Sequence, residues 1–323
     1  MLIVQKFGGS SLADGERLRH VAQLCLERRQ REQELVVVVS AMGDTTDILN
    51  TRAMEISGRP PLREMDALMT TGEQQCAALL VMSMEELGLH AVSLTGWQAG
   101  ILTDCRYGDG EIRLIAPARI EEELSRGRLP VVTGFQGICG RGDVTTLGRG
   151  GSDTTAVALA AALEADACEI YSDVDGIYTA DPRLLPEAKL LESIDFRDML
   201  ALSKAGSKVL HHKSVELAMA NNVELILLNS FKDGPGTRVA MLKDSQRPDF
   251  AGITGRKETG RISVGGKKAD AGSMSRAVLL LSELGIEVKS GSLGENIFTL
   301  EVEEKDFMPS MELLHRELVL ERK

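Results

Sequence analysis

The sequence predicts a doubly wound α/β region followed by a smaller α+β region. Short aliphatic runs recur along the first 240 of the 323 residues, and helical patterns alternate with them. Several runs are continuously apolar, as expected of parallel strands that are buried on both faces. The expected strands are 2–5, 35–40, 91–94, 130–133, 169–171 and 224–228.

The first expected strand runs into Lys6-Phe7-Gly8-Gly9. Glycines expose backbone N–H groups that can hold phosphate oxygens, and Lys6 adds a positive charge. The loop has neither the G-x-x-x-x-G-K-[ST] pattern of a Walker A loop nor the G-x-G-x-x-G pattern of a dinucleotide-binding turn. The sequence therefore predicts an anion site of another kind at the end of this strand.

Residues 101–127 predict a hairpin and a helix. Asp109-Gly110 is typical of a tight turn, here between strands 101–107 and 111–115. Pro117 suits the first position of a helix that ends near Gly127.

The segment 145–183 carries most of the functional signal. A glycine-rich turn, 148–151, precedes an alanine-rich helix over 154–163, which Ser152 is expected to cap and Asp153 to stabilise through the helix dipole. A strand over 168–171 then opens into the acidic turn 172–176. A helix start and a strand end of this kind build ligand sites in open α/β sheets.

From residue 238 the pattern changes. A polar linker is expected over 238–249, and the remainder orders as strand, helix, strand, strand and helix over 252–264, 273–284, 286–290, 296–302 and 310–318. We therefore expect two domains, 1–240 and 241–323.

Composition narrows the function classes. The net charge is −11, and residues 1–240 hold 24 Lys and Arg against 34 Asp and Glu, so nucleic acid and anionic membranes are not expected partners. No signal peptide or membrane helix is expected, and the five dispersed cysteines predict reduced thiols in a cytoplasmic protein. Neither the cysteines nor the adjacent His211 and His212, expected to point apart on a helix, predict a metal site.

Six segments in register resemble the aspartate kinases of the amino acid kinase family. They are KFGGSS at the N-terminus, VSAMGDTTD at 39–47, TTGEQ at 70–74, GFQG at 134–137, TTLGRGGSDTTA at 145–156 and SDVDGIYTADPR at 172–183. The resemblance covers roughly residues 1–240 and implies the amino acid kinase fold. One departure is His211-His212-Lys213-Ser214, where the family often has His-Pro-Arg-Ser.

The C-terminal region resembles a single ferredoxin-like ACT module, of which the family commonly carries two. The usual Asp-x-Pro-Gly effector loop is replaced by Ala269-Asp270-Ala271-Gly272-Ser273, so weak or absent regulation by lysine and threonine is expected. The resemblance also implies a homodimer or higher homo-oligomer.

The activity that the resemblance implies is phosphorylation of the side-chain carboxylate of L-aspartate by ATP, the first step towards lysine, threonine and methionine. The carboxylate nucleophile is already ionised at neutral pH, so positioning and charge neutralisation are the remaining tasks. Mg²⁺ is expected to arrive with ATP.

The resemblance assigns a role to each site residue. The expected catalytic residues are Lys6, Asp153 and Lys208. The expected aspartate-binding residues are Ser40, Thr45, Glu73, Phe135, Arg149 and Ser152, with Arg149 on the α-carboxylate and Glu73 on the ammonium. The expected nucleotide-binding residues are Lys6, Phe7, Gly8, Gly9, Ser172, Asp173, Tyr178, Asp181, Arg183, Lys208 and Val209.

Two alternatives stay open. One is another enzyme of the amino acid kinase family that acts on a different carboxylate or on a carbamate. The other is a non-catalytic regulatory homologue that senses amino acids. Glu73, Arg149 and the GRGGSD motif favour an aspartate kinase over the first alternative. Lys6, Asp153 and Arg183 favour an active enzyme over the second.

Overall fold

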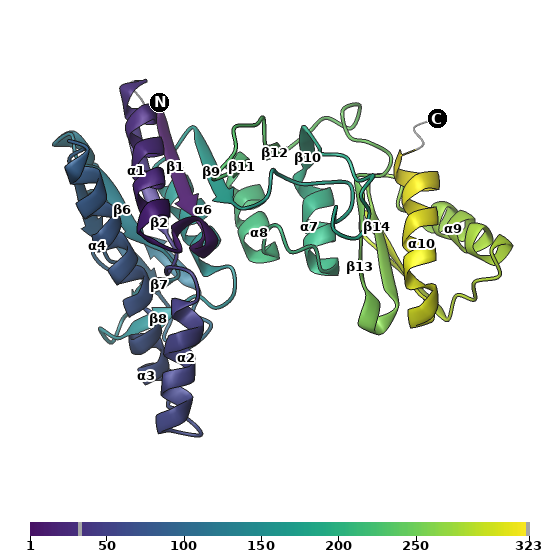
Figure 1. The fold of residues 1–323 in the computed structure, drawn as a ribbon, viewed down its shortest axis with the longest axis horizontal. Helices are drawn as coiled ribbons and strands as arrows, with labels where there is room; N and C mark the ends of the chain where they lie inside the picture. The colour runs from purple at the N-terminus through teal and green to yellow at the C-terminus, as the bar shows by residue number, and fades with distance from the viewer. Residues whose placement is uncertain (32–33, 321–323) are drawn as a thin grey trace. The chain divides into compact units, whose positions relative to one another are not determined.

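The computed structural model describes residues 1–31 and 34–320. The chain divides into two compact units, Met1–Asp175 with Ala220–Gly234 and Gly176–Met219 with Pro235–Lys323 (Figure 1). The domain boundary expected near residue 240 stays a prediction, and residues 321–323 of the expected C-terminal domain lie outside the described residues.

The first unit is built on a parallel sheet with the strand order β11-β9-β1-β2-β6-β3. Every strand expected from the aliphatic runs is present, with its ends within two residues of the prediction. The strands are β1 (Leu2–Phe7), β2 (Glu34–Val39), β3 (Ala91–Leu94), β6 (Leu129–Thr133), β9 (Ala167–Ser172) and β11 (Leu225–Asn229). The predicted parallel α/β architecture is therefore confirmed.

Helices cover both faces of this sheet because side chains alternate along each strand. Helices α1 (Gly15–Gln30) and α4 (Thr71–Glu86) lie side by side and share a core with Ile3 and Phe7 of β1 (Figure 1). Helix α6 (Gly151–Ala162) packs against β1, and Lys6 reaches it. The remaining helices of the unit are α2 (Thr45–Ile56), α3 (Leu62–Met69) and α5 (Ala118–Ser125).

A small second sheet in this unit has the order β5-β4-β7-β8. Its strands are β4 (Ile101–Thr103), β5 (Ile112–Ile115), β7 (Gln136–Cys139) and β8 (Val144–Thr146). Strands β4 and β5 are antiparallel as predicted, but the prediction of a tight turn at Asp109-Gly110 is wrong. A longer loop joins the two strands, because β4 already ends at Thr103. The Asp104 carboxylate closes this loop by accepting hydrogen bonds from the backbone N–H groups of Arg106 and Glu111. Pro117 is predicted at the first position of α5, but the helix begins one residue later, at Ala118, and Pro117 is its N-cap residue.

The prediction of five reduced thiols is wrong for one pair. Cys105 and Cys139 form a disulfide, with their Cα atoms 5.2 Å apart. Strands β4 and β7 run parallel with Thr103 opposite Cys139, so Cys105 comes beside it although 34 residues separate the two cysteines. Cys25, Cys76 and Cys168 are free and buried, and burial raises the pKa of all three thiols.

The second unit contains an antiparallel sheet with the order β13-β14-β16-β15. Its elements are β13 (Gly252–Arg256), β14 (Arg261–Gly265), α9 (Ala271–Glu283), β15 (Ser290–Gly294), β16 (Ile297–Glu301), α10 (Phe307–Leu314) and the π-helical turn η4 (His315–Leu320). The core beneath the helices includes Phe298, Phe307 and Met311. The expected small α+β region is therefore present.

Two strand predictions in this region are wrong. The single strand expected over 252–264 is a hairpin, because Gly260 takes a left-handed φ of 62° and reverses the chain. The strand expected over 286–290 begins only at Ser290, where pairing with Glu301 starts.

The rest of the second unit comprises β10 (Ser193–Asp195), α7 (Phe196–Ala205), part of α8 (His212–Asn221) and β12 (Thr237–Ala240), which pairs parallel with β10. The side chains of His211 and His212 do not point apart as predicted. Their ring centroids are 4.3 Å apart, because α8 begins at His212 and His211 precedes the helix.

The polar linker expected over 238–249 is wrong. Its first residues belong to β12, and Arg247 is buried against α7. The Arg247 guanidinium donates to both carboxylate oxygens of Asp198, at 2.5 and 3.1 Å. The segment is therefore a packed part of the second unit. In the described ranges, no helix combines the length and apolar character needed to cross a bilayer.

The Asp198–Arg247 pair gives a test of this packing. Replacing Asp198 by Ala removes the carboxylate that binds the buried guanidinium with two hydrogen bonds. It leaves the longer contacts to Asp244 and Asp195, at 3.5 and 3.9 Å, and the bond to Asn296. We expect a loss of about 3 kcal/mol in the free energy of unfolding. Glu216→Ala breaks the exposed Lys204–Glu216 pair in the same unit and should cost less than about 1 kcal/mol. Urea denaturation of both variants measures the difference, and equal losses would contradict the buried arrangement.

Candidate functional site

A cavity of about 560 Å³ lies in the first unit where β1, β2 and β6 end. Ligand sites of open α/β sheets form at this carboxyl edge. The cavity is lined by Lys6, Gly9, Ser40, Ala41, Gly43, Thr46, Glu73, Gly108, Phe135, Gly148, Arg149, Gly150, Gly151, Ser152 and Asp153.

An ion pair stands at one side of the cavity. The Lys6 Nζ lies 2.7 Å from Asp153 Oδ1, and both side chains are largely buried, at 11% and 14% exposure. Lys6 comes from the end of the central strand and Asp153 from the first turn of α6. The pair therefore places a positive charge beside the N-terminus of a helix, which itself favours anions.

The start of α6 differs from the prediction. Ser152 is not the N-cap, because the helix begins at Gly151 and Gly150 precedes it with a left-handed φ of 72°. A side chain at that position would be strained. Ser152 lies instead in the first turn and lines the cavity.

The Gly8-Gly9 loop leaves backbone close to the Lys6 ammonium. A Cβ atom on Gly9 would lie 2.9 Å from the Ala41 carbonyl oxygen, so a side chain there would displace backbone. The adjacent Phe7 ring is buried and stacks on Tyr171, with centroids 4.6 Å apart. The Phe7 ring is therefore not available to a ligand, and the Phe7 carbonyl oxygen already accepts from Ser40 N–H at 3.2 Å.

Glu73 brings an unsatisfied carboxylate to the cavity. The residue is 4% exposed, Oε1 accepts a hydrogen bond from Ala41 N–H at 3.1 Å, and the buried Oε2 has no hydrogen-bond partner among the residues that the structure describes. Burial raises the pKa of Glu73 to about 7. A cationic ligand group would supply the missing partner of Oε2 and favour the ionised form.

Arg149 is the exposed cation at the cavity. It lies between Gly148 and Gly150, which both have left-handed φ values, 70° and 72°. Its guanidinium forms no ion pair within residues 1–31 and 34–320, and two of its N–H groups can meet one carboxylate. The turn thus presents an anion-binding fork.

Phe135 has a left-handed φ of 69°, which costs conformational energy in a residue other than glycine. Its N–H donates to Thr155 Oγ1 at 3.1 Å, and its carbonyl oxygen accepts from Leu147 N–H at 2.9 Å. These bonds hold Phe135 at the cavity, between β6 and the Gly148 turn.

Of the other expected aspartate-binding residues, one lines the cavity and one does not. Ser40 lines the cavity, whereas the Thr45 hydroxyl donates to the Met42 carbonyl oxygen at 2.6 Å. The neighbouring Thr46 lines the cavity instead. Sequence reasoning missed Thr46 and Gly43, although both lie inside the VSAMGDTTD segment, and it missed Gly108.

The expected nucleotide-binding residues are divided between the two units. Ser172 ends β9 and Asp173 follows it in the first unit, and the Ser172 carbonyl oxygen accepts from Ser230 N–H at 2.8 Å. The second unit contains Tyr178, Asp181, Arg183, Lys208 and Val209.

Asp181 and Arg183 bind each other. They form an ion pair at 2.7 Å, and this guanidinium lowers the pKa of Asp181. Lys208 is exposed and Val209 is half-buried, both between α7 and α8. Their part in nucleotide binding stays a prediction.

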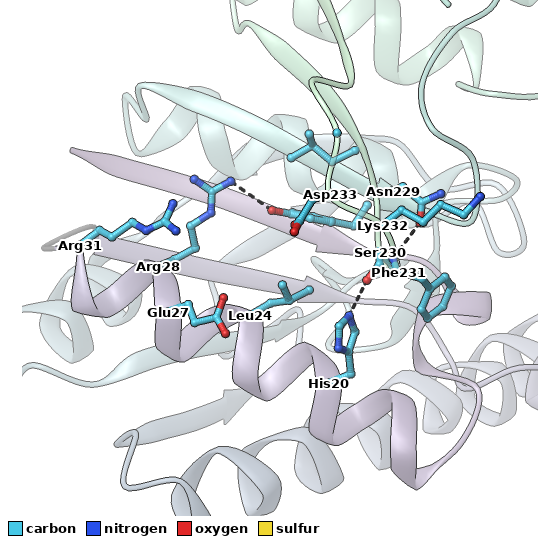
Figure 2. A pocket seen from close by; sticks show the side chains of 13 residues that line it. His20, Leu24, Glu27, Arg28, Arg31, Asn229, Ser230, Phe231, Lys232 and Asp233 are labelled. Carbon is cyan, nitrogen blue, oxygen red and sulfur yellow. Dashed lines mark hydrogen bonds between the residues drawn. The ribbon is translucent and has the colours of Figure 1, made fainter.

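A second cavity of about 260 Å³ lies in the first unit between α1 and residues 229–234. Figure 2 shows His20, Leu24, Glu27, Arg28 and Arg31 on the helix side of this cavity. Arg28 already binds Glu169 Oε1 at 3.0 Å and the Tyr171 hydroxyl at 3.3 Å.

His20 Nε2 lies 2.6 Å from the Ser230 carbonyl oxygen. The contacts of Arg28 and His20 therefore tie α1 to β9 and to the segment after β11.

Comparison with known proteins identifies relatives of the whole chain. Residues 1–229 match the model of the amino acid kinase family. The aspartokinase of Corynebacterium glutamicum is 47% identical over 291 residues, which are 89% of this chain and 69% of that protein.

Solved structures of aspartate kinases are also similar to this chain. The aspartate kinase from Synechocystis is 32% identical with a TM-score of 0.69, covering 98% of this chain and 69% of that one. The fold is also that of E. coli aspartokinase III in complex with aspartate and ADP, at 24% identity and a TM-score of 0.72, covering 94% of this chain and 79% of that one.

Glu73 makes the stability of the protein depend on pH. The ordinary pKa of its carboxyl is 4.5 and the folded value is about 7, so between these values the folded state alone keeps the proton. Stability is therefore lost as pH rises through this window, by up to about 3 kcal/mol. Glu73→Gln cannot ionise and should become the more stable protein at pH 8.

Urea denaturation of wild type and Glu73→Gln at several pH values between 4 and 9 measures this effect. The difference between the two proteins isolates Glu73, since all other groups titrate in both. Parallel profiles for the two proteins would show that Glu73 ionises in the folded state as it does in the unfolded state.

Proposed function

The chain belongs to the amino acid kinase family, among its aspartate kinases, and we propose how its residues carry out the reaction of that group. The reaction transfers the terminal phosphoryl group of ATP to the side-chain carboxylate of L-aspartate. A carboxylate oxygen forms the new bond to phosphorus, the bond to the bridging oxygen breaks, and ADP leaves with that oxygen. The protein has to align the two substrates and neutralise negative charge.

Glu73 and Arg149 bind the two ends of the amino acid backbone. The unpaired buried Oε2 of Glu73 accepts the α-ammonium, and the free fork of Arg149 holds the α-carboxylate. Ser40, Ser152 and the backbone around Phe135 complete the lining. Thr45 contributes by fixing the turn after β2, since its hydroxyl is bound to Met42.

Lys6 neutralises the transferring phosphoryl group. Its ammonium lies beside the Gly8-Gly9 backbone and the N-terminus of α6. The Gly8 N–H donates to the Tyr171 carbonyl oxygen at 3.3 Å, so of these two glycines it is Gly9 whose N–H is proposed to hold a phosphate oxygen. Asp153 orients Lys6 through the 2.7 Å ion pair. Charge develops between the two substrates in the transition state, so a cation fixed there lowers the barrier.

The remaining residues that we propose to contact the nucleotide are Ser172, Asp173, Tyr178, Asp181, Arg183, Lys208 and Val209. Lys208 supplies a second cation to the phosphates. We propose that Mg²⁺ enters with ATP, held chiefly by phosphate oxygens and water, and screens their charge.

The C-terminal α+β region is proposed as a single ACT-like module, on the support of its four-stranded antiparallel sheet and two helices. Residues 269–273 form the start of α9, where Asp270 caps the helix by accepting from Ser273 N–H at 2.9 Å. We propose that the chain acts as a homodimer or higher homo-oligomer in the synthesis of lysine, threonine and methionine.

The observation that carries the assignment of aspartate as substrate is the buried, unpaired Oε2 of Glu73 in the same cavity as Arg149 and Lys6. An ADP-coupled assay with aspartate, glutamate, acetylglutamate and uridine monophosphate tests it. Activity with aspartate alone is expected. Preference for another acceptor would favour a different amino acid kinase, and no turnover with any of the four would favour the regulatory homologue.

Lys6→Ala should nearly abolish turnover while the protein stays folded. The lost charge acts on the transition state more than on the bound substrates, so kcat should fall on the order of ~10³-fold. Lys257→Ala, at an exposed position in the second unit, is the matched control. A Lys6→Ala enzyme with a tenth of the wild-type kcat would remove Lys6 from the chemistry.

Arg149→Lys should impair the use of aspartate much more than the use of ATP. An ammonium cannot form the two parallel bonds of a guanidinium, so we expect the KM for aspartate to rise about tenfold or more. Arg141→Lys, at an exposed position in the turn between β7 and β8, is the control. An equal rise in both Michaelis constants would place Arg149 outside the aspartate pocket.

A further inference from the structure

Asp66 of α3 is a buried carboxylate that binds two distant segments of the first unit. Its side chain is 2% exposed. The Gly108 N–H donates to Oδ1 at 3.1 Å and to Oδ2 at 2.9 Å. The Thr146 N–H donates to Oδ2 at 3.1 Å, and the Thr146 hydroxyl donates to Oδ1 at 2.7 Å. Both oxygens are therefore fully used as acceptors.

Both partners of Asp66 lead directly to the proposed aspartate pocket. Gly108 lines the cavity and belongs to the loop between β4 and β5. Thr146 ends β8, two residues before the Gly148 turn that presents Arg149.

The loop and the turn also touch each other. A Cβ atom on Gly148 would lie 2.5 Å from Asp109 Oδ1, and Gly110 N–H donates to the Thr146 carbonyl oxygen at 2.7 Å. The position of the Arg149 turn therefore depends on where the loop is held.

Two further bonds hold this loop at its outer side. The Tyr107 hydroxyl donates to Asp143 Oδ2 at 2.9 Å, and Cys105 is joined to Cys139. Asp66 is the buried side chain that binds the cavity-lining residue of the loop and the end of β8 at once. It binds them through backbone N–H groups, so its oxygens determine where the backbone lies.

We propose that Asp66 is a positioning residue, which sets the loop 104–110 as a wall of the aspartate pocket and holds the Arg149 turn against it. This inference rests on the proposed function of the pocket. Asp66 does not touch the substrate. Asp66 fixes Gly108 and Thr146, which determine the side of the pocket that receives the α-carboxylate. The loss of Asp66 should therefore weaken the binding of aspartate more than the binding of ATP.

Asp66→Ala should raise the KM for aspartate about tenfold or more and change the KM for ATP less than about threefold. Asp66→Asn should keep the aspartate KM within about threefold of wild type. Its amide oxygen can still accept from both backbone N–H groups, and its NH₂ can donate to the Thr146 hydroxyl. A direct electrostatic role for Asp66 would make the asparagine variant as impaired as the alanine variant.

Asp143→Ala is the matched control, because it removes the bond to Tyr107 at the loop's outer side and the 2.7 Å ion pair with Arg63 of α3, while the bonds of Asp66 to backbone stay. It should leave the KM for aspartate nearly unchanged. If Asp66→Ala does not fold, Asp66→Glu replaces it. Glutamate keeps the charge but is one methylene too long for both backbone bonds, so it should impair aspartate use more than asparagine does. Near-wild-type kinetics of either folded variant, or an equal rise in both Michaelis constants, would overturn the proposal.

Amide hydrogen exchange separates this inference from the proposed function. In Asp66→Ala the amides of Gly108 and Thr146 should exchange faster than in wild type and in Asp66→Asn, whatever the enzyme phosphorylates. Unchanged exchange would overturn the anchoring role. A wild-type protein that does not phosphorylate aspartate would instead overturn the function, with the exchange result intact.

Discussion

The ion pair between Lys6 and Asp153 is the contact on which the proposed site depends. It joins the end of the central strand to the first turn of α6, and the backbone of the Gly8-Gly9 loop and of the Gly150 turn meets there. Burying an ammonium is costly unless a carboxylate offsets its charge. Asp153 supplies that carboxylate and leaves room beside the pair for a ligand, in a chain whose net charge is −11. Local cations, rather than the overall field, have to attract anionic substrates to such a protein.

Around this pair, some residues are held in place by hydrogen bonds, and others carry polar groups without a partner in the described part of the chain. Phe135 is held in a costly conformation by Thr155 and Leu147, and Asp66 fixes two backbone segments from beneath the pocket. Glu73 keeps one oxygen unpaired, and Arg149 is exposed without an ion pair in the described part of the chain. Preorganised groups of this kind reduce the cost of arranging a ligand when it binds.

The parallel sheet could be predicted because short aliphatic runs recur between helical patterns and several of them are continuously apolar. The cavity residues could be predicted where a glycine turn marks a strand end. Errors arose where a contact between distant residues decides the local structure. Cys139 lies beside Cys105 only because β7 pairs with β4, and Arg247 is buried only because Asp198 faces it. Gly260 reverses a run of residues that reads as one strand. Asp66 was missed because an aspartate in an amphipathic helix carries no sign of the segments that will bind it.

The unpaired oxygen of Glu73 couples substrate capture to the solvent. With a pKa of about 7, this carboxyl is partly protonated at neutral pH in the free protein. Pairing with an ammonium requires the ionised form, so each binding event expels a fraction of a proton into the buffer. The heat of aspartate binding measured by calorimetry would then vary with the ionisation enthalpy of the buffer, and the enzyme would acidify its surroundings slightly before any phosphoryl transfer takes place.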